Sequence, residues 1–516
     1  MLLNPDEYED ARQSRDARFD GRFFVGVLTT GIYCRPVCPV KIPMKKNVQL
    51  YPSAAAASAA GFRPCLRCRP ESSPGTPAWS GSSWKVSRAL QLIDQGYLDD
   101  GSVEGLANEI DVGSRQLGRL FQDHIGASPI EVAQTRRLHF AKKLIDETNL
   151  PLAEICFASG FGSVRRFNAV FVKTYDRTPK ELRQRKKGQI SKGSKAIEMT
   201  LSFRPPFAWK KLLAFLAYRH IPGVEHVTDN SYARTISLEG VTGDFRVEFS
   251  DASTQLKVQI NFPESRQLYH IIDRIRTVFD LRADSEKIER FFARDKILGP
   301  IVKKNGGLRV PGCWNGFEVA VRAVLGQQVT VKAATTLVGR IANSYGQQYS
   351  CDNPNLNRVF PSPEALLNCD LNNMGIVGQR IDAIKQIAEM VEHNDLIIDC
   401  TTKTDSFVEK ICSIKGIGEW TAYYIAMRAL SDPDAFPYSD LILRRAATRP
   451  GNTLTSKQLL QLSEGWRPWR AYSVIFLWAH YGAVHKPVME KVKTAKQAQT
   501  RAAKKLANLG RDLIPT

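Results

Sequence analysis

The stretch "ICSIKGIGEWTAYYIAMRAL" (Ile411–Leu430) joins two segments with apolar residues at helical spacing through a pair of glycines. Gly416-Ile417-Gly418 predicts a tight hairpin between two helices, because glycine accepts the backbone conformations that such a turn requires. The glycines also let backbone N–H groups approach a phosphate at the N-terminus of the second helix. We therefore expect Gly416 and Gly418 to face a nucleic-acid backbone.

A carboxylate and several aromatic residues accompany this hairpin. Trp420 and Tyr424 are four positions apart, so one face of a helix can present both rings. Asp440 follows in "AFPYSDLILRRA", and Trp478 lies in "GWRPWRAYSVIFLWAHYG". A carboxylate can stabilise the oxocarbenium-like sugar that forms when an N-glycosidic bond breaks, and aromatic faces attract a cationic base. The pattern favours base excision. The alternative role for Asp440 is a helix cap, and the alternative role for Trp478 is a core residue.

These residues resemble the helix-hairpin-helix DNA glycosylases, in particular the alkyl-base glycosylases of the AlkA type. The resemblance extends from Thr200 to Gly482 and includes an N-terminal α+β domain that starts at "MTLSFRPPFAWKKLLAFLAYRHIPGVE". It implies that Asp440 is the catalytic carboxylate. It also implies a pocket for a base that has left the helical stack, lined by Trp420, Tyr424 and Trp478.

Further positions define the expected class of glycosylase. Glycosylase-lyases of this superfamily keep a lysine where this chain has Trp420, so the resemblance implies hydrolysis without a lyase step. No cysteine follows Cys412, so the iron–sulfur cluster of some relatives is not expected. The residue that wedges into the duplex corresponds to Gln328, after "LGQ", although an apolar side chain is the better wedge.

Four cysteines near the N-terminus form two close pairs. Cys34 and Cys38 lie in "TGIYCRPVCPV", and Cys65 and Cys68 lie in "FRPCLRCRP". Two close pairs separated by a longer gap are typical of a tetrahedral zinc site with four thiolates. Zinc-bound thiolates are deprotonated, so the site can be an inert clamp or can hold a nucleophile.

The residues around the cysteines resemble the N-terminal domain of the Ada-type methyl-phosphotriester repair proteins. The resemblance implies that Cys34 is both a zinc ligand and the acceptor of a methyl group from a DNA phosphotriester. It also implies DNA-facing positions at Thr30, Lys41, Arg63 and Arg67. Methylation of one thiolate removes a negative charge near phosphates, so it would strengthen DNA binding and act as a damage-sensing switch.

A helix-turn-helix pattern occurs twice. "SVEGLANEIDVGSRQLGRLFQ" and "LPLAEICFASGFGSVRRFNAVFVKTY" place apolar residues at helical spacing on both sides of a glycine turn, and Ser114 is expected to cap a helix. The exposed faces are expected to carry groups that suit phosphates and base edges, namely Arg115, Gln116, Arg119, Arg165 and Arg166. Followed by "TYDRTPKELRQRK", the pair resembles the AraC-type DNA-binding domain. A plain helical bundle is the alternative.

The composition fits a basic, globular protein. The 516 residues include 72 Lys or Arg and 52 Asp or Glu, which gives a net charge of +20 and favours a polyanionic partner such as double-stranded DNA. We find no apolar run long enough for a membrane span and no secretory signal, so we expect no membrane partner and a cytoplasmic, nucleoid-associated bacterial protein. We further expect a monomer that contacts RNA polymerase.

The expected fold is multidomain and mainly α with α+β parts: a small zinc-binding α/β domain, a tandem helix-turn-helix domain, an α+β domain and an all-α glycosylase domain. "ESSPGTPAWSGSSW" (71–84) and "RQRKKGQISKGSKAIEM" (183–199) predict linkers. The expected division is a zinc methyl-acceptor domain at 1–78, an AraC-type domain at 79–187, a basic linker at 188–198, an AlkA-type N-terminal domain at 199–297, a glycosylase domain at 298–484 and a basic tail at 485–516.

The sequence therefore predicts a fused alkylation-response protein that senses phosphotriesters, regulates transcription and excises alkylated bases. One alternative is a transcriptional regulator whose glycosylase half binds DNA but is inactive. Another is a repair enzyme whose N-terminal half only tethers it to DNA, with purely structural zinc. Base release and methyl transfer to Cys34 distinguish the three.

Overall fold

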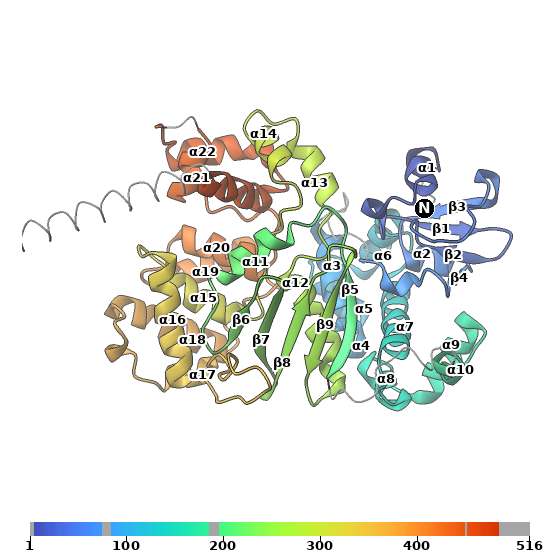
Figure 1. The fold of residues 1–516 in the computed structure, drawn as a ribbon, viewed down its shortest axis with the longest axis horizontal. Coiled ribbons are helices and arrows are strands. Elements are labelled where there is room, and N and C mark those ends of the chain that lie inside the picture. The colour runs from blue at the N-terminus through green and yellow to red at the C-terminus, as the bar shows by residue number, and fades with distance from the viewer. Residues whose placement is uncertain (1–4, 75–83, 185–195, 449–450, 484–516) are drawn as a thin grey trace, which may run out of the picture.

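The computed structural model describes residues 5–74, 84–184, 196–448 and 451–483 (Figure 1). The zinc-binding domain and the helix-turn-helix units lie at one end, a five-stranded sheet lies in the middle, and helices α15–α20 lie at the other end. Within these ranges no helix combines the length and apolarity needed to span a membrane. The expected basic tail at 485–516 lies outside the described residues.

The first domain is a four-stranded sheet with short helices. The strand order is β3-β1-β2-β4; β1 pairs antiparallel with β2 and β3, and β2 pairs in parallel with β4. Because β2 ends at Cys34 and β4 leads into Cys65, this parallel pairing brings the two cysteine pairs together. The elements are α1 (Pro5–Gln13), β1 (Phe24–Val27), β2 (Ile32–Cys34), β3 (Val48–Tyr51), α2 (Ala54–Ala59), β4 (Arg63–Pro64) and the 3₁₀ helix η3 (Pro70–Ser72).

Residues 84–184 form the expected tandem helix-turn-helix arrangement. The pairs α5–α6 and α8–α9 are joined by the long helix α7, which begins with a capping box between Ser128 and Glu131. The prediction that Ser114 caps α6 is wrong: Gly113 is the N-cap and Ser114 is the first helical residue. The helices are α3 (Trp84–Asp94), α4 (Tyr97–Asp100), α5 (Val103–Asn108), α6 (Ser114–His124), α7 (Pro129–Glu147), α8 (Leu152–Ala158), α9 (Val164–Tyr175) and α10 (Pro179–Gln184).

The third part is an antiparallel sheet in the order β5-β9-β8-β7-β6, with β5 at one edge. Alternating burial along β9 shows that one face packs into the core, as the period of a strand requires. The elements are β5 (Ile197–Ser202), α11 (Trp209–Ala217), β6 (Glu225–Val227), β7 (Ser231–Leu238), β8 (Val241–Glu248), β9 (Gln255–Asn261) and α12 (Leu268–Val278).

The last part is helical and surrounds a single large apolar core. Residues 470–483 are also helical and contain Trp478. The other helices are α13 (Ser285–Phe292), α14 (Leu298–Lys304), α15 (Gly316–Leu325), α16 (Val331–Tyr345), α17 (Pro363–Leu367), α18 (Gly378–Glu392), α19 (Thr404–Cys412), α20 (Glu419–Ala429), α21 (Leu441–Ala446) and α22 (Ser456–Ser463).

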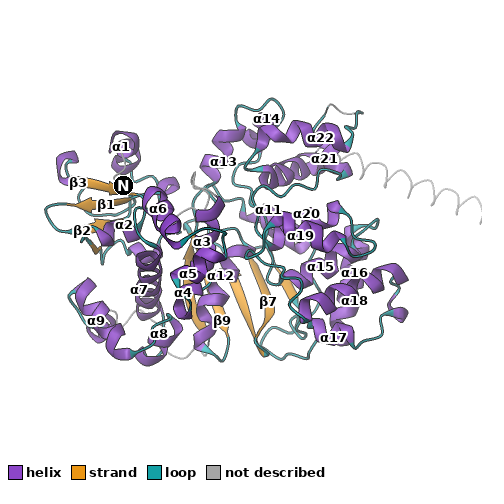
Figure 2. Cartoon of the chain, turned by 180° about the vertical axis from the view of Figure 1, so that it is seen from behind, coloured by secondary structure: helices purple, strands orange, loops and turns teal. Residues whose placement is uncertain are grey.

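The second helix-turn-helix unit and the five-stranded sheet share one apolar core. This core includes Phe140 and Phe167 from the helices together with Leu201 and Phe245 from the sheet. The ring of Phe140 meets Tyr269 of α12 edge-on, with centroids 4.8 Å apart. Figure 2 shows α7, α8, α12 and β9 close together from behind. The helix-turn-helix region and the five-stranded sheet are therefore packed against each other across a continuous interior.

Two predicted linkers are shorter than expected. Glu71 and Ser72 belong to η3 and are buried, because η3 packs against α7 and β5. Ile197 and Glu198 are the first residues of β5, where they pair with β9. The remaining linker residues at 75–83 and 185–195 lie outside the described part of the chain.

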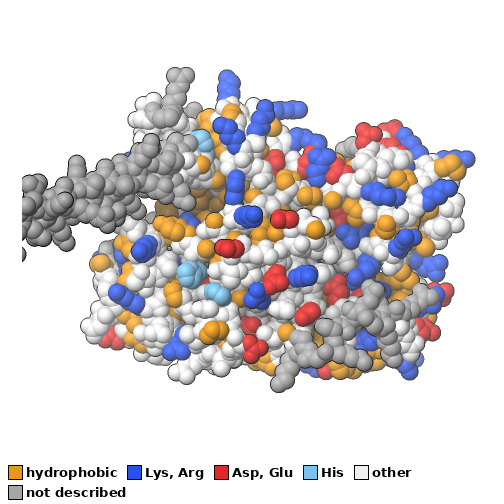
Figure 3. Space-filling view, in the orientation of Figure 1, with side chains coloured by type: hydrophobic (Ala, Val, Ile, Leu, Met, Phe, Trp, Pro, Cys, Tyr) orange, Lys and Arg blue, Asp and Glu red, His pale blue; other side chains and the backbone are white. Residues whose placement is uncertain are grey.

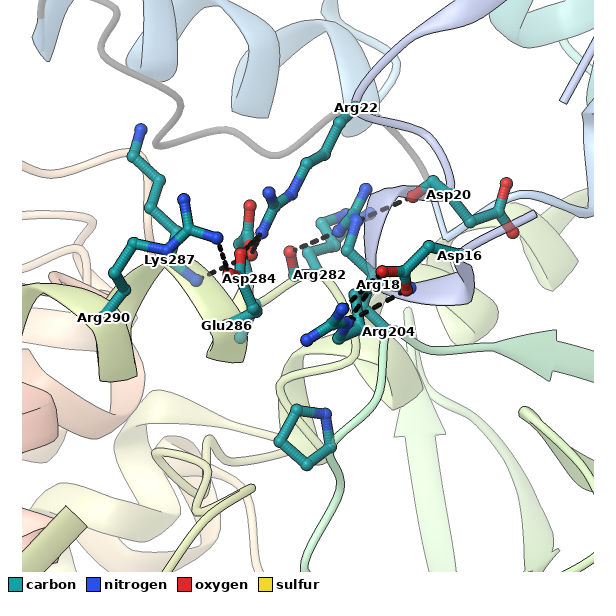
Figure 4. Close-up of polar contacts among 12 residues, drawn as sticks. Asp16, Arg18, Asp20, Arg22, Arg204, Arg282, Asp284, Glu286, Lys287 and Arg290 are labelled. Atoms are coloured by element: carbon teal, nitrogen blue, oxygen red, sulfur yellow. Dashed lines mark hydrogen bonds and ion pairs between the residues drawn. The ribbon is translucent and has the colours of Figure 1, made fainter. Parts of the chain in front are cut away.

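A polar interface joins the zinc-binding domain to the segment around α13 (Figure 4). Arg22 donates to Asp284 and, at 2.7 Å, to Glu286, and all three side chains are at most 13% exposed. Nearby, Arg204 donates to the Asp20 carbonyl at 2.8 Å and to the Arg282 carbonyl at 2.9 Å. Buried ion pairs of this kind stabilise an interface only while both partners are present.

Removal of Arg22 tests this interface. Arg22→Ala leaves the buried Asp284 carboxylate without its ion-pair partner and leaves Glu286 with only Arg290, so we expect a loss of about 3 kcal/mol in the free energy of unfolding. Arg290→Ala is the matched control, since Arg290 binds the same Glu286 but is 69% exposed; its loss should cost about 0.5 kcal/mol or less. Urea denaturation followed by tryptophan fluorescence measures both. Equal denaturation midpoints for the two variants would contradict the structure.

Candidate functional site

The four cysteines converge on one point. The Sγ atoms of Cys34, Cys38, Cys65 and Cys68 all lie within 4.8 Å of one another, and the four residues are buried. Tetrahedral zinc with Zn–S bonds of about 2.3 Å requires S–S separations of about 3.8 Å. The quartet therefore fits one zinc ion held by four thiolates.

Arg35, next to Cys34, stabilises this cluster. Its backbone N–H donates to the Cys68 Sγ at 3.3 Å, and its guanidinium donates to the Cys68 carbonyl at 3.2 Å. The same guanidinium forms a bidentate pair with Asp20, with one contact at 2.9 Å. Arg35 thus places a positive charge beside the thiolates and fixes the two cysteine pairs to each other.

The predicted DNA-facing residues of the N-terminal half are all exposed: Thr30, Lys41, Arg63, Arg67, Arg115, Gln116, Arg119, Arg165 and Arg166. Arg63 lies 3.9 Å from Asp176, the residue that ends α9, so the zinc-binding domain adjoins α9. Lys and Arg side chains are spread across the visible face of the molecule (Figure 3). Their exposure makes these side chains accessible to a phosphate backbone.

Asp440 is held by two indole groups in the catalytic half. Trp420 Nε1 donates to Asp440 Oδ2 at 2.9 Å, and Trp478 Nε1 donates to Oδ1 at 3.4 Å. Asp440 is also the N-cap of α21, because its Oδ1 accepts the Leu443 N–H at 2.9 Å. The cap that the sequence left as an alternative is therefore present together with the aromatic setting, and it fixes the carboxylate in place.

The three aromatic residues predicted to line a base pocket, Trp420, Tyr424 and Trp478, lie together and form an aromatic wall. The rings of Trp420 and Tyr424 are parallel within 8°, with centroids 5.5 Å apart. Trp478 approaches Tyr424 at 6.4 Å and is partly buried against the core. Trp478 thus packs partly against the core, as the alternative expected, and also lies beside Tyr424 and Asp440.

Sequence analysis missed the arginines behind this wall. Arg428 continues the spacing of Trp420 and Tyr424 by one more helical turn, and it donates to the Tyr424 hydroxyl at 3.1 Å. Arg219 and Arg322 also lie in the electrostatic environment of Tyr424. The four-residue spacing could have revealed Arg428, whereas Arg219 and Arg322 come from distant helices and leave no local signal.

The glycine hairpin has the expected geometry. Gly416 has a φ of +91°, a value that favours glycine, and Gly418 is the N-cap of α20; both are exposed. Gln327, which was not predicted, donates to the Gly416 carbonyl and to Thr421 Oγ1, both at 3.0 Å. Its neighbour Gln328 is exposed with a φ of +53°, at the turn before α16. The hairpin and the expected wedge are thus parts of one surface.

Family models match four successive parts of the chain. The metal binding domain of Ada matches residues 7–71, and a helix-turn-helix domain matches 106–185. The AlkA N-terminal domain matches 198–315, and the HhH-GPD superfamily base excision DNA repair protein matches 321–469. The expected fold class and the single zinc site are thereby confirmed.

Relatives match over the same regions. The chain is 40% identical over 471 residues to the probable bifunctional transcriptional activator/DNA repair enzyme AlkA of Mycobacterium tuberculosis. The matched region covers 91% of this chain and 95% of that protein. DNA-3-methyladenine glycosylase 2 of Escherichia coli is 29% identical over 288 residues, or 54% of this chain and 96% of that protein.

A solved structure agrees with these matches at the level of the fold. The 3-methyladenine DNA-glycosylase from Archaeoglobus fulgidus matches with a TM-score of 0.50 at 21% identity, over 55% of this chain and 97% of that one. The identity and coverage of the mycobacterial relative extend the likeness to all four domains. This chain belongs to the family of the bifunctional transcriptional activator/DNA repair enzymes of the AlkA and Ada type.

Proposed function

We propose that this chain is a bifunctional alkylation-response protein. It excises alkylated bases of the 3-methyladenine type by hydrolysis, accepts methyl groups from DNA phosphotriesters, and regulates transcription through its tandem helix-turn-helix domain. The observation that carries the excision proposal is the Asp440 carboxylate, held by the indole N–H groups of Trp420 and Trp478 beside an aromatic wall. The acidic group and the stacking surface that base removal requires lie within one site.

Excision follows from what this carboxylate can do. The alkylated base is cationic, so the bond from N to C1′ breaks with its electron pair leaving on the base, and little acid assistance is needed. Asp440 then stabilises the positive charge on the sugar and orients a water molecule that attacks C1′. The water proton passes to the carboxylate and from there to solvent. Trp420 occupies the position where a lyase keeps its lysine, so the DNA strand stays intact.

Methyl transfer follows from the cysteine quartet. Zinc, when bound by Cys34, Cys38, Cys65 and Cys68, keeps the thiols deprotonated at neutral pH. The Cys34 thiolate attacks the methyl carbon of the phosphotriester, an S–C bond forms, and the C–O bond breaks with its electrons leaving on the phosphate oxygen. The resulting thioether is neutral, so repulsion between the cluster and nearby phosphates falls and DNA binding strengthens.

The proposal also covers the expected partners, oligomeric state and cellular location of the protein. Double-stranded DNA is the partner of both halves, with Gly416, Gly418 and Gln328 on the glycosylase side. The regulatory role implies contact with RNA polymerase by a monomeric protein in the bacterial cytoplasm. A regulator with an inactive glycosylase half is the second candidate, and the exposed recognition helices alone would suit it.

Cys34 is the predicted methyl acceptor. After incubation of the protein with methylated duplex DNA, mass spectrometry should find one methyl group on the peptide that contains Cys34. Cys34→Ser should abolish both the methyl label and the increase in promoter affinity that methylation causes, because the acceptor sulfur is gone. Cys156→Ser, which alters a buried cysteine in α8, should leave both unchanged. A label that survives in Cys34→Ser would exclude Cys34 as the acceptor.

Asp440 is the predicted catalytic carboxylate. Asp440→Asn removes the charge but keeps a helix cap, since asparagine caps as well as aspartate. We expect base release from methylated duplex DNA to fall by about a hundredfold or more, with DNA binding retained. The surface variant Asp251→Asn should release bases at the wild-type rate. Full activity in Asp440→Asn would favour a different catalytic group.

The indole of Trp420 is predicted to contribute more than a stacking surface. Trp420→Phe keeps an aromatic ring but removes the 2.9 Å bond to Asp440, so base release should fall by about tenfold, the scale of a lost charged hydrogen bond. Trp466→Phe is the control, since Trp466 makes an equivalent 2.9 Å bond to Asp295 away from the pocket. Base release by Trp420→Phe that matches the control would refute this role.

A further inference from the structure

The helices α13 and α14 and the start of α11 present a surface with only one sign of charge. In the described segments 208–211 and 284–306, every exposed charged residue is a cation. Lys and Arg side chains project from the molecule over α13 and α14 (Figure 3). We call this surface the basic ridge. Its members are Lys210, Lys211, Arg290, Arg294, Lys296, Lys303 and Lys304.

The acidic residues of the same segments are buried or partly buried, and each takes part in a structural contact. Asp284 and Glu286 bind Arg22 and are only 5% and 12% exposed. Glu289 accepts a backbone N–H that follows α14, and Asp295 accepts an indole N–H at 2.9 Å. The segments therefore have charges of both signs in their sequence but expose only the positive ones.

Direct contacts make the ridge one continuous surface. Lys211 on α11 donates to Asn305, which follows α14, at 2.8 Å. Glu289 accepts the Gly307 N–H, so the middle of α13 also lies beside this end of α14. The lysines of α11 are therefore close to those that end α14. Because α14 has 7 residues and a helix rises about 1.5 Å per residue, the ridge continues for about 10 Å to the cations of the turn between α13 and α14.

Such a surface fits the phosphate backbone of double-stranded DNA. Surfaces that only keep a protein soluble usually mix both signs of charge, whereas a field of one sign attracts a polyanion. Duplex DNA carries about one negative charge per 1.7 Å of its axis, so a ridge of this length meets several phosphates at once. In the described part of the chain only Arg290 among the ridge residues forms an ion pair, so the other cations can bind phosphates without losing an acidic partner.

The residue types of the ridge suit a contact that does not read the DNA sequence. Most of its cations are lysines, whose ammonium is a flexible point charge rather than the rigid fork that pairs with a base edge. Contacts to phosphates position a protein on DNA but carry no sequence information directly. Phe291, which is 40% exposed between Arg290 and the turn, adds an apolar surface for a deoxyribose.

The ridge lies between the two proposed reaction sites. Arg22 ties the start of α13 to the zinc-binding domain. At the other end of α13, the ring of Phe292 meets Phe476 edge-on with centroids 6.1 Å apart, and Phe476 shares a helix with Trp478. A duplex bound to the ridge would therefore lie next to both domains that act on damage.

We propose that the basic ridge binds the phosphate backbone of undamaged double-stranded DNA without reading its sequence, and thereby keeps the protein on DNA during the search for lesions. The ridge belongs to other elements than the glycine hairpin and the helix-turn-helix units. This inference goes beyond the proposed chemistry, because it concerns DNA that holds no lesion.

The first test measures binding of the full chain to an undamaged duplex by fluorescence anisotropy at several salt concentrations. Lys303→Gln combined with Lys304→Gln should weaken binding by about tenfold or more at about 0.1 M salt. It should also lower the slope of log K against log salt by about 2, because two phosphate contacts are lost. Arg246→Gln combined with Lys257→Gln is the matched control, since it removes two exposed cations from the five-stranded sheet, and it should keep the wild-type slope. Equal slopes for the two double variants would overturn the proposal.

The second test locates the DNA on the unmutated protein. Lysines are acetylated with an amine-reactive reagent, and the modified peptides are quantified by mass spectrometry. An undamaged duplex should slow the modification of Lys296, Lys303 and Lys304 but not of Lys257, which is equally classed among the exposed lysines and lies on β9. Protection of the ridge by RNA polymerase but not by DNA would overturn the proposal and make the ridge a protein-binding surface.

The outcomes also separate this proposal from the proposed excision activity. A protein whose ridge is protected by undamaged DNA, but which releases no alkylated base, would refute the glycosylase function and support the ridge. A protein that releases bases, but whose ridge lysines stay reactive in the presence of DNA, would refute the ridge alone. With all substrate bound, the Lys303→Gln and Lys304→Gln double variant should release bases at the wild-type rate, because neither lysine contacts Asp440 or the aromatic wall. A slower release at saturation would assign the lysines to the catalytic step and overturn the search role.

Discussion

Glu147, the last residue of α7, joins three domains through a single carboxylate. It accepts from Arg69 of the zinc-binding domain at 2.9 Å, from Lys143 of its own helix at 2.9 Å, and from the Thr200 N–H of β5 at 3.0 Å. Burial disfavours its charge, but Lys143 and Arg69 outweigh burial and hold its pKa below the ordinary value. Its contribution to stability is therefore present above the ordinary glutamate pKa and is lost as the pH falls through the lowered one.

The arrangement of the whole molecule depends on this junction. Arg69 follows the zinc ligand Cys68 directly, and Thr200 lies in the edge strand of the five-stranded sheet, so Glu147 ties the metal site to the glycosylase half. The apolar core shared by α7, α8, α9 and the sheet lies beside it. A charged network alone would be a weak connection, because desolvation offsets most of its attraction. Together with the shared core, it gives the two halves a defined relative position.

Much of the fold could be predicted because the decisive signals are local. The cysteine spacing, the two glycine turns and the four-residue step from Trp420 to Tyr424 each lie within a few residues of one another. The features that sequence analysis missed join distant segments. Trp420 binds Asp440, Arg428 binds carbonyls that precede α15, and Arg22 meets Asp284 across 262 positions. Nothing in a short window encodes such pairs, since the tertiary fold creates them.

Predictions from local composition and residue type were wrong where tertiary packing determines the structure. The Ser- and Pro-rich composition after Cys68 predicted a linker from Glu71 onward, but Glu71 and Ser72 are buried against α7 and β5. Ser114 has a favourable residue type for a cap, but Gly113 takes that position, so the serine is helical. Asp440 shows the opposite case: the alternative prediction of a helix cap is confirmed, and the cap holds the carboxylate together with the indole N–H groups of Trp420 and Trp478.

The two proposed reactions act on lesions that change the charge of DNA in the same direction. Methylation of a phosphate removes one negative charge, and methylation of a ring nitrogen adds one positive charge, so both lesions make the DNA locally more positive. The protein has a net charge of +20, which attracts undamaged DNA everywhere, yet each proposed site contains acidic groups. Four thiolates would face the neutral triester, and Asp440 would face the cationic base. Intact DNA would be held by the basic surface and repelled at these two points. Damage would remove that repulsion, so recognition and reaction depend on the same charge.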